Sequence, residues 1–306
     1  MPTETVYGLA ANALNTEAIA RIYSIKKRPS YNPLIVHVSS INDFSKYAVI
    51  PQGSKVAERL EKLSTFWPGP LTVVLQSFGK ICENVSAGTN TIALRIPNNP
   101  VALKLLQECN LPLAAPSANP SGYISPTSAE HVMQTLGDSF GIILDGGPCK
   151  LGIESTVLSL VEENPVILRP GIITKEQIEE ALSEELATYV ENTANKPTSP
   201  GMLQEHYAPH TPLAFIDETD LSKYAADKIG FLTFNDNSDF KQKFRKTIFL
   251  STNGSMQEAA HKLYSALYEL DRAGLDLIVV EKVGESDIGA AIMNRLKRAV
   301  SRTQSL

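Results

Sequence analysis

Short apolar runs recur along the chain from its N-terminus to about Arg169. Each run is β-branched or leucine-rich and is bounded by glycine, proline, asparagine or serine, a pattern typical of buried strands. The predicted strands are Leu34–Val38, Leu71–Gln76, Thr91–Ile96, Leu111–Ala115, Gly141–Asp145, Thr156–Leu160 and Val166–Arg169.

Between these runs, apolar residues recur at helical spacing. The predicted helices are Thr16–Lys27, Ser54–Ser64, Pro100–Cys109, Ser128–Leu136 and Thr174–Ser183. Thr16 and Ser128 are the expected N-caps of their helices, and Thr174 with Gln177 is an expected capping box. Because helices alternate with strands, this part of the chain is predicted to be an α/β domain with a mixed sheet.

The pattern breaks between Glu184 and Pro212, where prolines, glycine and small polar residues favour neither helix nor strand. An α/β rhythm then resumes, which predicts a small layer of parallel strands. Its elements are strands at Leu213–Ile216, Ile229–Phe234, Thr247–Leu250 and Asp276–Glu281, and helices at Ser255–Ala273 and Ile288–Ser301. We therefore expect two domains, 1–184 and 213–306, joined by a linker over 185–212.

Composition narrows the class of protein. A length of 306 residues fits two domains better than one core. The net charge of −5 argues against a general nucleic-acid binder, so any phosphate site is expected to be local. No apolar run of membrane-spanning length and no secretory leader is visible, which predicts a cytoplasmic protein. Cys82, Cys109 and Cys149 form no CxxC pair and are expected to be reduced, mostly buried thiols.

Residues suited to ligand binding gather near the N-terminus. The run Met1-Pro-Thr-Glu-Thr-Val-Tyr-Gly-Leu9 offers hydroxyls and a carboxylate, and Lys26-Lys-Arg-Pro-Ser-Tyr-Asn-Pro-Leu-Ile-Val-His37 offers three cations, an amide and an imidazole. A basic trio at a helix end ordinarily complements the helix dipole. Here Lys26, Lys27 and Arg28 lead directly into a strand flanked by Asn32 and His37, and this combination favours a site.

An arginine interrupts the apolar strand Thr91–Ile96. Alternation places Thr91, Ala93 and Arg95 on one face, and a buried arginine requires a partner. A structural carboxylate and an anionic ligand both fit this requirement.

Three later segments add candidates. The loop Pro116-Ser-Ala-Asn-Pro-Ser-Gly122 is either a turn or a place where hydroxyls and N–H groups meet phosphate. Ser155, in Gly152-Ile-Glu-Ser-Thr156, has no GxSxG context and is interpreted as a ligand contact rather than a nucleophile. Arg169 precedes a turn and is either a surface arginine or a phosphate contact. His206 and His210 are four apart, but Pro209 argues against a helical metal site.

Taken in order, these segments resemble the threonylcarbamoyl-AMP synthase family in its two-domain form. The matching segments are Pro2–Leu9, Lys26–His37, Phe66–Leu75, Thr91–Pro97, Ala115–Gly122, Ile153–Val157, Leu168–Gly171 and Ser199–Pro209. The resemblance implies a YrdC-like catalytic domain, with a twisted mixed sheet and flanking helices, followed by a small Rossmann-like α/β domain. It also implies a helix and a strand ahead of Pro2, so we expect the true start to lie upstream of Met1.

The resemblance also implies roles for individual residues. Lys26 and Arg28 match a Lys-x-Arg element and are the implied catalytic pair, and no metal ligand is implied. The implied threonine contacts are Thr5, His37, Arg95, Ala115 and Ser155. The implied ATP contacts are Arg28, Asn32, Thr91, Ser117, Asn119, Ser125, Arg169 and Tyr207.

The implied reaction joins L-threonine, bicarbonate or CO2, and ATP into threonylcarbamoyl-AMP and diphosphate. The product would pass to the machinery that makes t6A at position 37 of tRNA, with at most weak contact to the tRNA itself. Magnesium is expected to arrive with ATP, and the linker is expected to act as a lid over the site. Two alternatives stay open: a carbamoyl-adenylate transfer module, and a non-catalytic protein that binds double-stranded RNA.

Overall fold

The computed structural model describes residues 1–187, 206–236 and 244–304. Its larger part is built on a mixed seven-stranded sheet with the order β1-β5-β2-β4-β3-β6-β7. The strands are β1 Ala11–Asn12, β2 Ile35–His37, β3 Leu71–Gln76, β4 Thr91–Arg95, β5 Leu113–Ala114, β6 Thr156–Ser159 and β7 Val166–Arg169. The pairs β2–β4 and β3–β6 are parallel and the other neighbours are antiparallel, which confirms the predicted mixed sheet.

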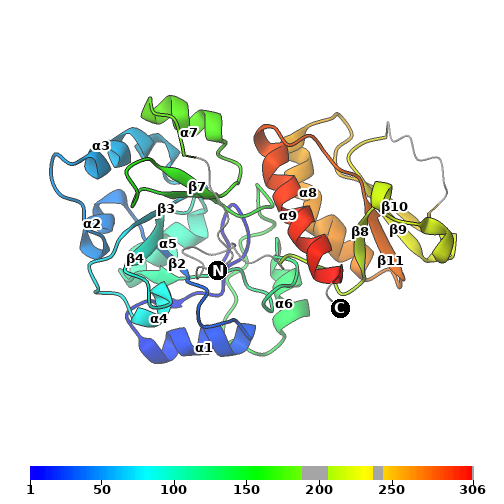
Figure 1. Ribbon diagram of the computed structural model, residues 1–306. Coiled ribbons are helices and arrows are strands. Elements are labelled where there is room, and N and C mark those ends of the chain that lie inside the picture. The colour runs from blue at the N-terminus through cyan, green and yellow to red at the C-terminus, as the bar shows by residue number, and fades with distance from the viewer. Residues whose placement is uncertain (188–205, 237–243, 305–306) are drawn as a thin grey trace.

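Helices flank this sheet (Figure 1). They are α1 Thr16–Lys26, α2 Phe44–Tyr47, α3 Lys55–Lys62, α4 Glu83–Ser86, α5 Pro100–Cys109, α6 Ala129–Leu136 and α7 Lys175–Leu182. The main core lies between helices and one sheet face, where Ile92 and Leu94 of β4 are buried. Ala93 joins a separate cluster with Ile35 and Val74. The alternation predicted for β4 is therefore correct, and Arg95 shares the face of Ala93.

Local signals for helix starts were mostly reliable. Ser128 accepts a hydrogen bond from the His131 N–H, and Thr174 with Gln177 forms the predicted capping box. At α1 the prediction was wrong by one residue. Asn15 is the N-cap, with its side chain accepting from the Ala18 N–H at 2.9 Å. The Thr16 hydroxyl instead contacts the sulfur of Cys82.

The strand predicted at Gly141–Asp145 does not form. A strand needs a hydrogen-bonded neighbour, and no strand within the described residues pairs with this segment. Ile142 is instead largely exposed. Of the cysteines, Cys149 is buried, whereas Cys82 and Cys109 are half-buried, so the expectation that most are buried was wrong.

A second unit follows with the strand order β10-β9-β11-β8. Its strands are β8 Leu213–Phe215, β9 Ile229–Thr233, β10 Lys246–Phe249 and β11 Leu277–Val280, and its long helices are α8 Met256–Asp271 and α9 Asp287–Gln304. Every pair of strands is parallel, as predicted. Ser255 caps α8 by accepting from the Glu258 N–H. The predicted linker residues Ser199–Met202 lie outside the described residues.

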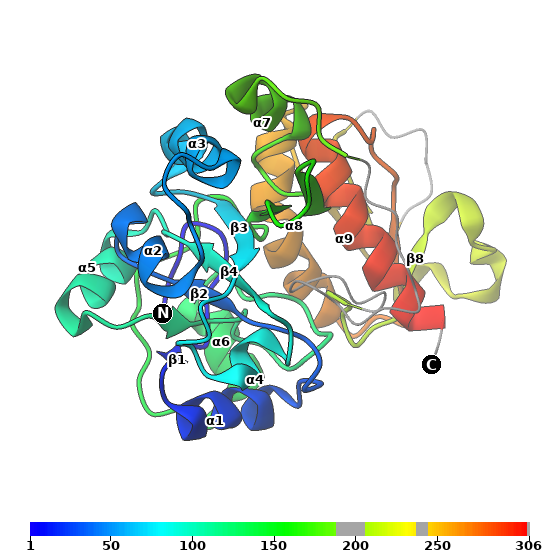
Figure 2. The same cartoon turned by 60° about the vertical axis from the view of Figure 1, so that its left-hand side comes forward.

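Helices α8 and α9 lie between the two sheets (Figures 1 and 2). One apolar cluster unites residues of these helices with Val6, Tyr123, Ile124 and Ile153 of the larger part. The two parts therefore share a core. Within the described part of the chain, no helix combines the length and apolar character needed to cross a membrane.

Candidate active site

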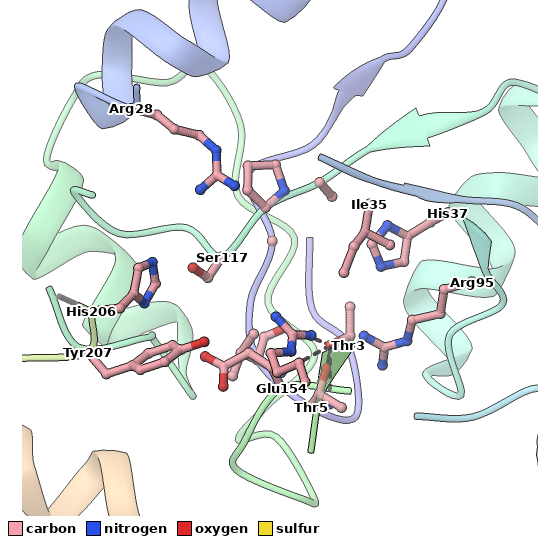
Figure 3. A pocket seen from close by; sticks show the side chains of 15 residues that line it. Thr3, Thr5, Arg28, Ile35, His37, Arg95, Ser117, Glu154, His206 and Tyr207 are labelled. Carbon is pink, nitrogen blue, oxygen red and sulfur yellow. Dashed lines mark hydrogen bonds between the residues drawn. The ribbon is translucent and has the colours of Figure 1, made fainter. Parts of the chain in front are cut away.

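One pocket collects side chains from segments that are far apart in the sequence (Figure 3). It opens on the sheet face that carries Arg95, and its enclosed space is only about 50 Å³. The lining residues are Thr3, Thr5, Val6, Gly8, Arg28, Ile35, His37, Arg95, Ala115, Pro116, Ser117, Glu154, Arg169, His206 and Tyr207. Eight of the residues predicted as threonine or ATP contacts are therefore brought together: Thr5, Arg28, His37, Arg95, Ala115, Ser117, Arg169 and Tyr207.

Arg28 enters the pocket because α1 stops abruptly. Lys27 closes the helix in the left-handed conformation, and the chain turns at Pro29. Arg28 then donates from Nε to the Asn32 carbonyl at 3.0 Å and from Nη2 to the Pro33 carbonyl at 2.8 Å. These carbonyls fix the guanidinium in place. Burial lowers the pKa of Arg28 to about 10, which leaves it cationic at neutral pH.

Lys26 does not line the pocket. Its buried ammonium donates to the carbonyls of Ser117 at 2.6 Å and Asn119 at 2.5 Å. Burial, and then the charge of Arg28, lower its pKa well below the ordinary value. Lys26 thus holds the loop that carries Ser117 against the end of α1.

Arg95 and His37 lie on the opposite side of the pocket from Arg28 and His206 (Figure 3). Arg95 donates from Nη2 to Glu4 at 2.7 Å and from Nε to the Gly69 carbonyl at 3.3 Å. A structural carboxylate is therefore present, although Arg95 also faces the pocket. Burial, followed by the charge of Arg95, lowers the pKa of His37 to about 3, so its imidazole is neutral, and its buried Nδ1 has no hydrogen-bond partner among the described residues.

Near the N-terminus, the chain from Thr3 to Val6 forms a tight turn that is held by threonine hydroxyls. Thr3 donates its hydroxyl proton to the Val6 carbonyl at 2.6 Å and accepts from the Val6 N–H at 3.1 Å. Because that proton is used, Thr5 is the donor in the 2.8 Å contact between the two hydroxyls. The lone pairs of Thr5 remain available to a ligand.

Ser155 lies behind the lining. Its hydroxyl contacts the Thr72 hydroxyl at 2.8 Å and accepts from Arg169 Nη2 at 3.1 Å. Arg169 also donates to the Ser155 carbonyl at 2.8 Å. Ser155 therefore orients Arg169, and the Thr72 hydroxyl in turn holds the Ser155 hydroxyl.

Four predicted ATP contacts lie away from the lining. Asn32 is fully buried, and within the described part of the chain neither polar atom of its amide has a hydrogen-bond partner. Asn119 donates to the Tyr123 carbonyl at 2.8 Å, and Ser125 donates to Glu154 at 2.6 Å. Thr91 lines a different cavity of about 430 Å³ beside Pro33 and Ala93.

Sequence reasoning missed Glu154 as a site residue. It is the only carboxylate among the lining residues, and its oxygens accept from Ser125, Tyr264 and Arg295. Burial opposes ionisation, but the charges of Arg295 and then Arg169 prevail and lower its pKa to about 2. Its place beside Ser155 was a usable signal, whereas Tyr264 and Arg295 gave none.

No group of three or more histidine, cysteine, aspartate or glutamate side chains is placed to hold a metal among the described residues. The pocket carboxylate, Glu154, already accepts from three donor groups of the protein.

Two family comparisons cover the chain in succession. The family described as "Telomere recombination" matches residues 1–171, and the family described as "Threonylcarbamoyl-AMP synthase, C-terminal domain" matches residues 173–301. The threonylcarbamoyl-AMP synthase of Bacillus subtilis is 41% identical over 310 residues, which span 97% of this chain and 88% of that protein.

Solved structures show the same likeness. The crystal structure of P. abyssi Sua5 complexed with L-threonine superposes with a TM-score of 0.87 at 36% identity, over 99% of this chain and 90% of that one. A P. abyssi Sua5 variant, with an adjacent histidine and tyrosine replaced by alanine, superposes with a TM-score of 0.86 at 35% identity, over 99% and 88% of the two chains.

Proposed function

The chain belongs to the threonylcarbamoyl-AMP synthase family, and from that premise we propose how its pocket divides between threonine and ATP. It is a nucleotidyltransferase of the two-domain type that makes threonylcarbamoyl-AMP for t6A modification of tRNA. The observation that carries the division is the spread of arginines across the pocket. Arg95 stands beside His37, while Arg28 stands on the opposite side (Figure 3).

We assign threonine to the Arg95 side. An arginine can bind a carboxylate through two parallel N–H groups, and Arg95 is held for this by Glu4 and the Gly69 carbonyl. The remaining contacts are assigned to Thr5, His37 and Ala115, with Ser155 behind them. Neutral His37 suits an amino acid whose nitrogen must be unprotonated before it can react.

We assign the ATP phosphates to the side of Arg28, Ser117, Arg169 and Tyr207. Arg28 and Arg169 are anchored through backbone carbonyls, so they enter the reaction already oriented. Asn32, Asn119 and Ser125 support this wall from behind, and Thr91 marks a second cavity into which the nucleotide could extend. Lys26 holds the Ser117 loop rather than touching substrate. Mg²⁺ enters as part of the ATP complex.

The chemistry needs no protein nucleophile. The threonine amine adds to CO2, supplied as bicarbonate, and gives a carbamate and a proton. A carbamate oxygen then attacks the α-phosphorus, and diphosphate leaves with the electron pair of the broken P–O bond. The protein contributes in-line positioning and stabilises the charge that develops on the phosphates.

The segment His206–Thr211, here called the strap, covers the pocket through His206 and Tyr207. An enclosed space of about 50 Å³ is far below the several hundred Å³ of ordinary ligand sites. We propose that the strap withdraws to admit substrates and then closes over the labile carbamate. Deletion of residues 199–209 should therefore change ATP affinity or turnover. If both stay unchanged, the proposed movement of the strap is incorrect.

We also propose a wider setting for the protein. The units 1–184 and 213–306 act together through the linker 185–212. The product passes to the t6A transferase machinery in the cytoplasm, and any contact with tRNA is weak because the net charge is −5.

The test is diphosphate release with threonine, bicarbonate and ATP supplied together or one at a time. We expect release to require all three, with Arg95→Ala raising the KM for threonine and Arg28→Ala reducing kcat, each by at least about 100-fold. Lys104→Ala, an exposed cation, is the matched control. Diphosphate release without threonine would refute the proposal.

A further inference from the structure

A buried arginine of the second unit reaches the wall of the pocket. Arg295 of α9 is 1% exposed, and its Nε lies 2.9 Å from a Glu154 oxygen. Its Nη1 donates to the Pro170 carbonyl at 2.7 Å, next to Arg169. Its guanidinium carbon lies 5.4 Å from the centre of the Tyr207 ring. One side chain thus touches three separate pocket segments.

Three buried donors hold the Glu154 carboxylate. One oxygen accepts from Ser125 at 2.6 Å and Tyr264 at 3.1 Å, and the other accepts from Tyr264 at 3.0 Å and Arg295 at 2.9 Å. The single hydroxyl proton of Tyr264 is shared between the two oxygens, so three donors hold the carboxylate, and its lowered pKa keeps it ionised at neutral pH. Glu154 therefore orients other groups instead of acting as a base.

Tyr207 is held in a strained conformation by the same helices. Its φ is 69°, a left-handed value that non-glycine residues adopt only when their surroundings enforce it. Its ring stacks on Tyr264 at 5.9 Å, and the neighbouring His206 N–H donates to the Arg298 carbonyl at 3.3 Å. The buried Tyr207 hydroxyl has no hydrogen-bond partner in the ranges that the structure describes, and Tyr207 belongs to the pocket lining.

The charged pair also stands out in its surroundings. The rest of the junction consists of an apolar cluster and of hydrogen bonds, such as those of Tyr123 to Asp271 and of Tyr268 to the Ile124 carbonyl. A buried ion pair stabilises a fold no better than apolar residues of the same size. Stability alone therefore does not account for an arginine and a glutamate at this junction.

We propose that Arg295, assisted by Tyr264, is a positioning residue for adenylation, which makes helices α8 and α9 of the second unit part of the active site. The proposal rests on the proposed function. Arg295 fixes Glu154, the turn after Arg169 and the ring of Tyr207 in one arrangement. Loss of that arrangement moves the groups that meet the ATP phosphates while leaving them present.

The charge of Glu154 gives the proposal a distinctive signature. The ionisable groups around it are Arg295 from α9, Tyr264 from α8, Arg169 from the end of β7, and His206 from the strap. Arg295 is the main counter-charge that offsets the effect of burial, so its removal should raise the pKa of Glu154. Glu154 should then take up a proton at a higher pH than in the parent enzyme.

The test compares Arg295→Gln, Glu154→Gln and the double variant with the parent enzyme, each assayed for threonine-dependent diphosphate release across near-neutral pH. Lys297→Gln is the control, because Lys297 is an exposed cation two residues along the same helix. We expect Arg295→Gln to lower kcat/KM by about 100-fold and to add a loss of activity toward acid pH. The double variant should keep the lower rate without the acid loss.

Arg295→Lys guards against a variant that fails to fold. Lysine keeps the positive charge, so this variant should keep the parent pH profile. It lacks the planar guanidinium that reaches both Glu154 and the Pro170 carbonyl, so kcat/KM should still fall. An unchanged rate and pH profile in Arg295→Gln, or parent activity in the double variant, would overturn the inference. Failure of the proposed function would be seen separately, as threonine-independent release by the parent enzyme.

Discussion

At the scale of single residues, the site depends on which charges are matched inside the protein. Glu4 pairs with Arg95, and Glu154 pairs with Arg295. Both carboxylates are almost fully buried, so each pair is shielded from salt and water. Neutralising either carboxylate therefore changes the position of an arginine rather than only the net charge.

Glu154 should make stability depend on acid pH. Its folded-state pKa is about 2, below the ordinary 4.5, so its contribution is complete above about pH 4.5 and is lost as pH falls toward 2. The shift corresponds to about 3 kcal/mol. Urea unfolding of the parent and of Glu154→Gln at stepped pH should show a gap that narrows over this range. A constant gap would contradict the assignment.

The Tyr207 hydroxyl should matter to the ligand and not to the fold. Since no described residue bonds to this hydroxyl, Tyr207→Phe should leave Tm unchanged but raise the KM for ATP about 10-fold. Tyr268→Phe is the contrasting variant, because it removes a hydrogen bond to the Ile124 carbonyl at 2.9 Å. That variant should lower Tm instead. Equal effects of both variants on KM would argue against the role of Tyr207.

The residues that sequence reasoning brought to the pocket share a local signal. Arg95 stands in an apolar strand, and Arg28 and Ser117 stand where an element ends. Such polar positions can be recognised without knowing the fold. The position of Glu154 beside Ser155 offered such a signal, but its partners Tyr264 and Arg295 did not, since they lie 110 and 141 residues further along.

At the scale of elements, prediction succeeded where the signals that define a helix or strand lie within the segment itself. Helix α5 and strands β3 and β7 have the predicted bounds, because caps, turns and periodicity lie within the segment. Gly141–Asp145 has the composition of a strand but no neighbour within the described residues. A strand forms only when a second segment pairs with it, so the sequence of Gly141–Asp145 alone could not show that a partner strand is missing there.

The approach of α8 to the turn before β6 depends on one glycine. Gly152 has φ 79°, and an added Cβ would lie 2.3 Å from the His261 carbonyl oxygen in the backbone of α8. Gly152→Ala should therefore destabilise the protein by about 3 kcal/mol or more and lower its activity. Gly254→Ala is the matched control.

Gly254 has φ 76° with open space around it, so its substitution carries the backbone strain without the collision. That cost should be about 1 kcal/mol. Thermal unfolding of both variants would separate the two effects. A similar Tm in the two would mean that α8 does not press on Gly152.

At the scale of the whole molecule, Asp271 ties three regions together. It accepts from the Tyr123 hydroxyl at 2.6 Å and from the strap N–H groups of His210 at 3.2 Å and Thr211 at 2.7 Å. Asp271→Ala should cost about 2–4 kcal/mol, since it leaves several donors unpaired. It should also raise the KM for ATP by loosening the strap.

The measurements for Asp271→Ala are thermal unfolding and ATP kinetics, with the exposed Glu285→Ala as control. Asp271→Asn keeps one acceptor oxygen and should fall between the two. A drop in Tm with ATP kinetics unchanged would show that the strap is held independently of Asp271.

The position of α8 and α9 between two sheets has a consequence for descent. Val6, Tyr123, Ile124 and Ile153 are buried in one apolar cluster with residues of those helices. A family member that lost the second unit would expose this apolar surface to solvent and would lack Arg295, the partner of Glu154. We expect single-unit descendants of this fold to carry hydrophilic residues at those four positions and to have replaced Glu154 together with them. Substitutions at the four apolar positions and at Glu154 should therefore occur together when sequences of the family are compared.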